Sequence, residues 1–285
     1  MKILVTGADG FTGKHFVAHA QQAGYEVHEL KADLTNPSAL VVEVLDAAPN
    51  LVVHLAAISF VAHADVDALY KVNVVGTTNL LDALCSLPSP PQRVLIASSA
   101  NIYGNTEASP IEESMTPFPI NHYATSKLAM EFMAKTYLDR LAIFFTRPFN
   151  YIGVGQADFF VIPKIVKHFR QRAPYIELGN LDVEREFNDV RFVCDAYLKL
   201  LKDASVGESY NICSGKPYPL KVVLDLLTEM TSHSLEVRTN PEFVRINEIK
   251  RLFGNPAKLF GVVGEINEFT LRETLHVLLS QPDEA

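Results

Sequence analysis

Short apolar runs alternate with longer amphipathic stretches through the first half of the chain. The apolar runs predict strands at 2–6, 26–30, 51–55, 93–98 and 142–146. The stretches between them predict helices at 12–23, 37–48, 66–86 and 121–139. Because strands that alternate with helices form parallel sheets, we expect an α/β fold built on a doubly wound parallel sheet.

After residue 150 the pattern loosens and loops become more frequent. Helical stretches are predicted at 161–172, 190–202 and 219–231, with a strand at 208–212. We therefore expect a large domain over 1–150 and a smaller, interleaved C-terminal α/β lobe over 151–285, with 186–205 returning to the large domain. The proline-rich segment 87–91 is typical of a surface loop and not of a domain linker.

Composition restricts the partners of the chain. It has 285 residues, of which 48% are hydrophobic, so it can bury a substantial core. The formal net charge of −8 and the absence of a basic block argue against nucleic acid or an anionic membrane surface as a partner. Cys85, Cys194 and Cys213 are far apart and odd in number, which favours a reducing compartment. The N-terminal apolar run is too short for a signal peptide and no stretch is long enough to span a membrane, so we expect a cytoplasmic protein.

A glycine-rich turn follows the first predicted strand and opens the first predicted helix. Its sequence is Gly7-Ala8-Asp9-Gly10-Phe11-Thr12-Gly13. The first glycine permits a tight turn, the second lets a pyrophosphate approach the backbone, and the third permits close helix packing. Backbone N–H groups at such a turn can hold the pyrophosphate of a dinucleotide. The turn therefore predicts a Rossmann-type sheet that binds a dinucleotide cofactor.

A second motif, Tyr123-Ala124-Thr125-Ser126-Lys127, lies in the middle of the chain. Tyr123 and Lys127 are separated by four positions and therefore share one face of the helix predicted at 121–139. An ammonium beside a phenol favours the phenolate, so we expect the Tyr123 pKa to be lowered toward neutral pH. With the glycine turn, this pair indicates nicotinamide-dependent oxidation or reduction.

Four further stretches accompany these two motifs, and the set resembles one family. The stretches are Asp33-Leu34-Thr35, His54-Leu55-Ala56-Ala57, the segment from Asn73 to Leu81, and Ser98-Ser99-Ala100-Asn101-Ile102-Tyr103-Gly104. In this order they resemble the extended short-chain dehydrogenase/reductase family, also called the NAD-dependent epimerase/dehydratase family, which modifies nucleotide sugars. The likeness covers most of the chain.

The resemblance assigns three catalytic residues. Tyr123 would be the general acid that protonates a substrate carbonyl, and Lys127 would hold the nicotinamide ribose and tune Tyr123. Ser99 lies at the position of the family's catalytic hydroxyl, and Ser98 is the alternative if the alignment shifts by one.

The cofactor is expected to be NADPH, with NAD possible. Lys31 occupies a position where NAD-preferring relatives carry an acid, and a cation there suits a 2′-phosphate; the alternative is a solvated surface lysine. Asp33 and Leu34 would border the adenine. The resemblance gives this set of cofactor-binding residues: Gly7, Gly10, Phe11, Thr12, Gly13, Lys31, Asp33, Leu34, Leu55, Ala56, Ala57, Tyr123 and Lys127.

The nucleotide-sugar substrate is assigned to the second lobe. Besides Ser99, its expected ligands are Asn150, Arg185, Arg245 and Arg251, the last two as a phosphate clamp or as ordinary surface arginines. Phe149, Phe159 and Phe160 would stack on a base or fill the core. His54 is expected to be structural, and no histidine has metal-ligand spacing, so no metal is predicted.

Within the family, the segments 187–191 and 207–215 look most like the GDP-4-keto-6-deoxymannose reductases, which make GDP-rhamnose. The implied activity is NADPH-dependent reduction of a nucleotide-linked 4-keto-6-deoxyhexose at C4. The alternatives are a 4-epimerase with tightly bound NAD, a reductase of dTDP-linked sugars, and a non-catalytic NAD(P)-binding regulator. Relatives pair through two long helices, here 66–86 and 121–139, so the resemblance also implies a homodimer.

Overall fold

The computed structural model describes residues 1–59, 65–106, 109–244 and 250–281. Its centre is a six-stranded sheet in the order β10-β5-β4-β3-β1-β2. All five neighbouring pairs are parallel. The strands are β1 (Lys2–Thr6), β2 (Glu26–Glu29), β3 (Leu51–His54), β4 (Arg93–Ala97), β5 (Ile143–Pro148) and β10 (Ser209–Ile212).

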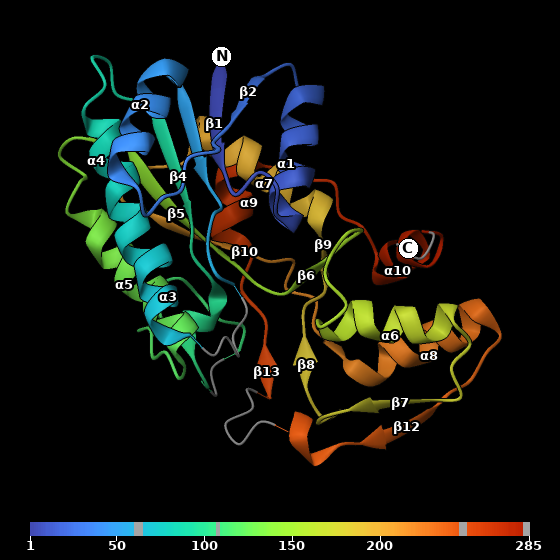
Figure 1. Ribbon diagram of the computed structural model, residues 1–285. Helices are drawn as coiled ribbons and strands as arrows, with labels where there is room; N and C mark the ends of the chain where they lie inside the picture. Colours follow the sequence, from blue (N-terminus) through green and yellow to red (C-terminus); the bar gives the residue numbers. More distant parts are fainter. Residues whose placement is uncertain (60–64, 107–108, 245–249, 282–285) are drawn as a thin grey trace.

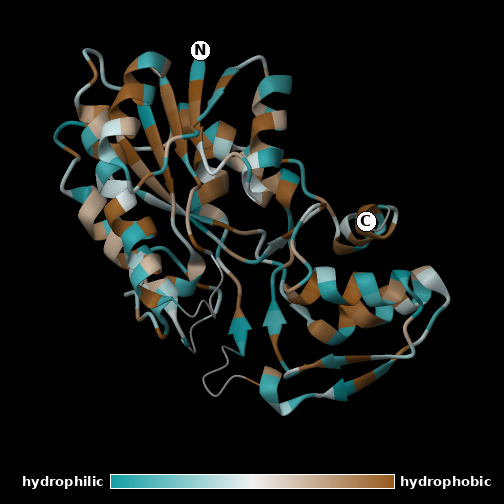
Figure 2. Ribbon diagram, viewed as in Figure 1, coloured by the Kyte–Doolittle hydropathy of each residue, from teal (hydrophilic) through white to brown (hydrophobic). Residues whose placement is uncertain are grey.

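Helices cover both faces of this sheet (Figure 1). One face carries α1 (Phe11–Gln22), α7 (Val190–Asp203) and α9 (Ala257–Val263), and the other carries α2 (Pro37–Ala47), α4 (Thr77–Cys85) and α5 (His122–Lys135). Side chains alternate between the two cores: Ile3 and Val5 of β1 pack with α1 and α7, whereas Leu4 packs with α2 and α4. Because both faces are covered, the inner strands β1, β3, β4 and β5 are mainly apolar and brown in Figure 2, whereas the edge strand β2 is polar.

The remaining elements form a smaller layer beside the sheet, with its own apolar core (Figure 1). It contains α6 (Val161–Arg170), α8 (Leu220–Thr231), α10 (Leu271–Leu279), β7 (Tyr175–Leu178) and β12 (Glu236–Thr239). Short strands lie between the two layers: β6 (Tyr151–Ile152), β8 (Glu184–Arg185), β9 (Asn188–Asp189), β11 (Tyr218–Pro219) and β13 (Arg251–Leu252).

The doubly wound α/β fold is confirmed, and the predicted strands and helices of the first half lie within a few residues of the observed ones. The helix predicted at 66–86 is divided into α3 (Val66–Tyr70), a π-helical segment η1 (Lys71–Gly76) and α4. The helix predicted to reach residue 139 ends at Lys135. The assignment of separate roles to 1–150 and 151–285 stays a prediction. Among the described residues, none of the helices is long and apolar enough to cross a membrane.

Candidate active site

The glycine turn joins β1 to α1 in a conformation that needs glycine. Gly7 has φ +67°, and a Cβ on it would lie 2.8 Å from the Ala56 Cα. A Cβ on Gly13 would lie 2.0 Å from the Gly7 carbonyl oxygen. The Gly10 N–H donates to that same oxygen at 3.1 Å. The turn is therefore packed against the end of β3, and α1 begins directly above it.

The N-terminus of α1 has the features of an anion site. Gly10 provides no side-chain cap, whereas Asn36, Asn121 and Asp189 cap α2, α5 and α7 with side-chain oxygens. The first-turn N–H groups of α1, which include those of Phe11 and Thr12, therefore face outward without a capping side chain, and the helix dipole favours negative charge there. These residues fit a dinucleotide pyrophosphate, which they would hold through backbone N–H groups.

Tyr123 and Ser99 are brought together at the end of β4. Asn121 caps α5 by accepting from the Ala124 N–H at 2.8 Å, which places Tyr123 in the first turn of that helix. Ser99 is the N-cap of the short 3-10 helix η2 (Ala100–Tyr103), and its side chain is hydrogen-bonded to Tyr123. Ser98 is also buried, but its hydroxyl has no partner within the described part of the chain. The geometry thus links Ser99, and not Ser98, to the phenol.

Lys127 lies one turn after Tyr123 and is only 3% exposed. Its Nζ donates to the Ala97 carbonyl oxygen at 2.7 Å. Burial lowers the pKa of Lys127 to about 8, although the nearby Glu131 carboxylate opposes this shift. The ammonium is therefore held at the end of β4, close to the peptide that leads to Ser98 and Ser99.

The expected lowering of the Tyr123 pKa is wrong for this structure. Burial raises the pKa of Tyr123, because a phenolate loses its hydration there, and the hydrogen bond from Ser99 only partly offsets this rise. The Lys127 ammonium, which was expected to favour the phenolate, donates to Ala97 instead. Tyr123 is consequently a neutral phenol at neutral pH, which suits a group that donates a proton.

A chain of buried polar groups links β1, β3, η1 and α4 beside the site. Thr77 donates its hydroxyl proton to the Asn73 carbonyl oxygen, so His54 Nε2–H donates to Thr77 at 2.8 Å and His54 Nδ1 accepts from Thr6 at 2.7 Å. Burial lowers the pKa of His54 to about 3, so this histidine stays neutral. The prediction that His54 is structural agrees with this geometry.

Asn73 connects the cofactor side of the site to the helix that carries Tyr123. Its side chain accepts from the Ile58 N–H at 2.9 Å and donates to Ser126 Oγ at 3.0 Å. Asn73 lies in the π-helical segment η1, and such segments are frequent at functional sites. Asn73 thereby fixes the position of the loop after β3 relative to the first turns of α5.

A buried ion pair lies behind Lys127. Arg147 Nε and Nη2 donate to the two carboxylate oxygens of Glu131 at 3.0 and 2.7 Å. Arg147 Nη1 also donates to the Tyr103 hydroxyl at 2.9 Å, which in turn donates to Asn211 Oδ1 at 2.8 Å. This network joins α5, β5, η2 and β10, and it fixes the helix that carries the catalytic candidates.

Two of the predicted substrate residues, Arg185 and Arg251, lie on the short strands between the two layers. Arg185 and Arg251 are on neighbouring strands β8 and β13. Arg185 Nη1 donates to the backbone carbonyls of Glu184 and Lys250, and Arg251 Nε donates to the Glu184 carboxylate at 2.7 Å. The Asn150 side chain is exposed, and its backbone oxygen accepts from the Asn188 N–H at 3.0 Å. Arg245 lies outside the described residues.

The aromatic candidates divide between core and surface. Phe149 is buried and stacks on Tyr103 with ring centroids 6.4 Å apart. Phe159 is 59% exposed, and its ring lies 4.6 Å from that of Phe160. Phe149 therefore fills the core, and Phe159 is left with an accessible ring.

The predicted adenine side of the site follows β2. Lys31 is exposed and forms an ion pair with Glu29 at 2.8 Å. The Asp33 carboxylate accepts from the Thr35 N–H and hydroxyl at 2.8 Å, which lowers the Asp33 pKa. Leu34 is buried against Gly76, at the start of α4. Leu55 and Ala57 lie in the loop after β3, on either side of Ala56.

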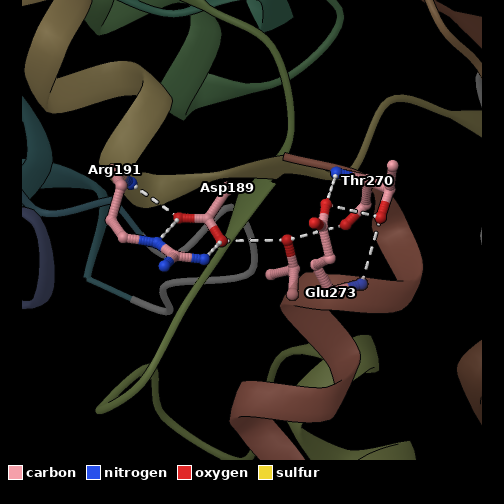
Figure 3. Close-up of polar contacts among 5 residues, drawn as sticks. Asp189, Arg191, Thr270 and Glu273 are labelled. Carbon is pink, nitrogen blue, oxygen red and sulfur yellow. Dashed lines mark hydrogen bonds and ion pairs between the residues drawn. The ribbon is translucent and has the colours of Figure 1, made fainter. Parts of the chain in front are cut away.

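The second lobe is tied to the sheet domain by carboxylates of the segment 186–189. Asp189 accepts from the backbone and side chain of Arg191 and from the Thr274 hydroxyl of α10, next to the Thr270–Glu273 capping box (Figure 3). Glu186 is fully buried and accepts from the backbone N–H groups of Gly254 and Ser214, both at 2.7 Å. These bonds fix the position of β8 and β9 relative to β10.

Comparison with known proteins identifies the family. Residues 3–213 match the family described as NAD dependent epimerase/dehydratase. The chain belongs to this family. Membership confirms the resemblance inferred from the six motifs, and it makes the protein an NAD(P)-dependent oxidoreductase with an extended short-chain dehydrogenase/reductase fold.

Two named relatives and one solved structure are similar to this protein over nearly the whole chain. A GDP-6-deoxy-D-talose 4-dehydrogenase from Aggregatibacter actinomycetemcomitans is 39% identical, and the match covers 95% of this chain and 94% of the relative. A GDP-6-deoxy-D-mannose reductase from Pseudomonas aeruginosa is 34% identical, and the match covers 98% of this chain and 96% of the relative. The solved structure of RMD from Pseudomonas aeruginosa, complexed with NADPH, has a TM-score of 0.90, 34% identity, and coverage of 98% and 97%.

Four residues that support this site were given no role of their own from the sequence. They are Asn73, Glu131 and Arg147, which support Tyr123 and Lys127 from buried positions, and Tyr151, which bonds to the glycine turn. Polar residues inside otherwise apolar stretches were the signal available for the first three. Their partners, however, lie 15 or more positions away in the chain.

Proposed function

We propose that the protein reduces the C4 keto group of GDP-4-keto-6-deoxymannose with NADPH, forming GDP-rhamnose. The observation that carries this proposal is a neutral Tyr123 phenol, hydrogen-bonded to Ser99 and followed one turn later by Lys127, in a protein with a pyrophosphate-binding turn. Two similar relatives named for oxidation or reduction of GDP-linked 6-deoxyhexoses support the sugar and the base. The solved structure of RMD from Pseudomonas aeruginosa in complex with NADPH supports the cofactor.

When bound, NADPH supplies the hydride that reduces the ketone. The residues of the chain provide the proton and the orientation. Tyr123 gives its hydroxyl proton to the C4 oxygen, and Ser99 donates a hydrogen bond to the same oxygen. Lys127, whose ammonium donates to the Ala97 carbonyl oxygen, would hold the nicotinamide ribose.

The residues at 100 and 101 argue against dehydration. Related 4,6-dehydratases carry an acid pair there, whereas this chain has Ala100 and Asn101, with the Asn101 amide bonded to Ser99 at 3.1 Å. Without a carboxylate at this place, the site lacks the acid that drives loss of water. Reduction is therefore favoured, and a 4-epimerase with retained NAD is the alternative within the family.

The stereochemistry at C4 separates two candidate products. The names of the relatives imply opposite C4 configurations, because talose is the C4 epimer of mannose. The 39% identity to the talose enzyme favours GDP-6-deoxytalose as the second candidate product. The sugar face that lies over the nicotinamide decides between the two products.

The proposed function is tested by mixing the purified protein with NADPH and each of three 4-keto-6-deoxysugars, linked to GDP, dTDP or UDP. We expect fast loss of NADPH absorbance with the GDP sugar and a kcat/KM at least about tenfold lower with the others. Product analysis by NMR then distinguishes rhamnose from 6-deoxytalose. Absence of oxidation with all three sugars, together with NAD retained through purification, would contradict the proposal and support the epimerase.

The pH dependence follows from the Lys127 pKa, which burial lowers to about 8. Lys127 is charged below that pH and loses its proton above it, so we expect kcat/KM for NADPH to be flat between pH 6 and 7.5. Above pH 8 it should fall about tenfold per unit, since this parameter reports the free enzyme. A profile that stays flat up to pH 9.5 would show that the Lys127 charge is not needed.

A further inference from the structure

A segment that follows the predicted substrate residue Asn150 is fastened to the first turn of α1. The Tyr151 hydroxyl and Thr12 Oγ1 are 2.7 Å apart, and the Phe11 and Tyr151 rings are stacked with centroids at 5.9 Å. His15 Nε2 lies 2.7 Å from the Val154 carbonyl oxygen. A Cβ on Gly153 would lie 3.2 Å from the Phe11 ring. Residues 151–154 therefore contact Phe11, Thr12 and His15, three half-buried positions in the first turns of α1.

The same segment is also fastened to the substrate side. Tyr151 and Ile152 form β6, which pairs in parallel with β9, and the Asn188 N–H donates to the Asn150 carbonyl oxygen at 3.0 Å. Asn188 in turn donates to the buried Glu186 at 2.8 Å. One short strand thus touches the glycine turn through its side chains and the inter-layer strands through its backbone.

The Tyr151 hydroxyl lies in a buried place close to the catalytic candidate. Burial is the largest cause that raises the pKa of Tyr151 to about 12, and the interaction with Tyr123 contributes to the rise. Tyr151 is therefore a neutral hydroxyl, and its bond to Thr12 ties it to the turn where the pyrophosphate is expected.

We propose that Tyr151 is a positioning residue that couples cofactor binding at the glycine turn to substrate binding at Asn150. This inference rests on the proposed function, since it concerns the two ligands of that reaction. The first-turn N–H groups hold the pyrophosphate, so a bound cofactor orders the Thr12 backbone. The Thr12–Tyr151 bond then orders β6 and places Asn150 before the sugar arrives.

Coupling of this kind is reciprocal. If bound NADPH tightens the site for the nucleoside diphosphate by some factor, the nucleoside diphosphate must tighten NADPH binding by the same factor. Loss of the hydroxyl bond removes the shared factor and leaves each binding site intact. Equilibrium binding therefore separates this role from a merely structural one. A structural defect would weaken the binding of both ligands but would leave unchanged the ratio of the NADPH dissociation constants with and without the nucleoside diphosphate.

The test uses the full-length protein and measures the NADPH dissociation constant by fluorescence, with and without saturating GDP. For the wild type we expect GDP to tighten NADPH about fivefold or more. For Tyr151→Phe the two constants should agree within about twofold, while the value without GDP stays within about threefold of wild type. Thr12→Val removes the same bond, so GDP should likewise fail to tighten NADPH binding, and the double variant should lose no further coupling.

Tyr137→Phe is the matched control. Its hydroxyl donates to Asp82 at 2.8 Å within the other core, so the variant loses a comparable bond and should keep the wild-type coupling. Coupling retained in Tyr151→Phe, or absent from the wild type although both ligands bind, would overturn the inference alone. Failure of NADPH or GDP to bind the wild type would overturn the proposed function, and the inference with it.

Discussion

Replacement of Tyr123 by phenylalanine should lower kcat for ketone reduction by a factor of about 10² to 10⁴, the usual contribution of a positioned general acid. The ring fills the same buried place, so the fold and the cofactor site are kept, and only the proton and the bond to Ser99 are lost. Stopped-flow measurement of NADPH oxidation under single-turnover conditions reports the chemical step. The NADPH dissociation constant should change by less than about threefold.

The control for this variant is Tyr137→Phe, two residues after the end of α5, which removes a hydroxyl that donates to Asp82. It should oxidise NADPH at the wild-type rate. If Tyr123→Phe also kept the wild-type rate, another group would have to supply the proton. The mechanism proposed for this protein would then be wrong at its central residue.

Replacement of Arg147 by methionine should destabilise the protein by about 3–5 kcal/mol. The substitution leaves the Glu131 carboxylate buried without its two guanidinium bonds, and it removes the donor to the Tyr103 hydroxyl. Glu131 is 1% exposed, so water cannot replace those bonds without rearrangement. Chemical denaturation at pH 7.5 measures the change in the free energy of unfolding.

Two further variants isolate the cause. The double variant Arg147→Met with Glu131→Leu removes both charges and should recover part of the lost stability, because no uncompensated charge remains. Lys221→Ala breaks an exposed ion pair with Asp225 and should leave the unfolding midpoint unchanged. If Arg147→Met were as harmless as Lys221→Ala, the buried pair would contribute nothing to the support of Tyr123 and Lys127.

The fold and the family could be predicted from the sequence because both depend on local patterns. Apolar runs of strand length, separated by helical periodicity, determine a parallel sheet whose two faces are covered. The glycine turn is also a local feature, since the positive φ of Gly7 and the close approach of Gly13 to the Gly7 oxygen involve neighbouring residues. Hydrophobic periodicity and motif spacing were therefore sufficient to predict the sheet and the glycine turn.

The electrostatics of the site could not be predicted in the same way. The spacing of Tyr123 and Lys127 correctly places them one turn apart, but the pKa of each depends on burial, which the rest of the chain creates. The hydrogen-bond partners of the arginines could not be predicted either. Arg251 bonds to Glu184 because of the register in which β13 pairs with β8. The Thr12–Tyr151 bond joins residues 139 positions apart, so no local sequence pattern predicts it.

The most direct test of the central claim is the fate of deuterium carried in both hydrogen positions of the nicotinamide C4 of NADPH. The protein is mixed with deuterated NADPH and GDP-4-keto-6-deoxymannose, and the sugar product is examined by NMR and mass spectrometry. The proposed reaction predicts a single deuterium at C4 of the sugar, with an equivalent amount of NADP⁺ formed. A sugar without deuterium, or with deuterium at another carbon, would contradict C4 reduction as the function of this protein.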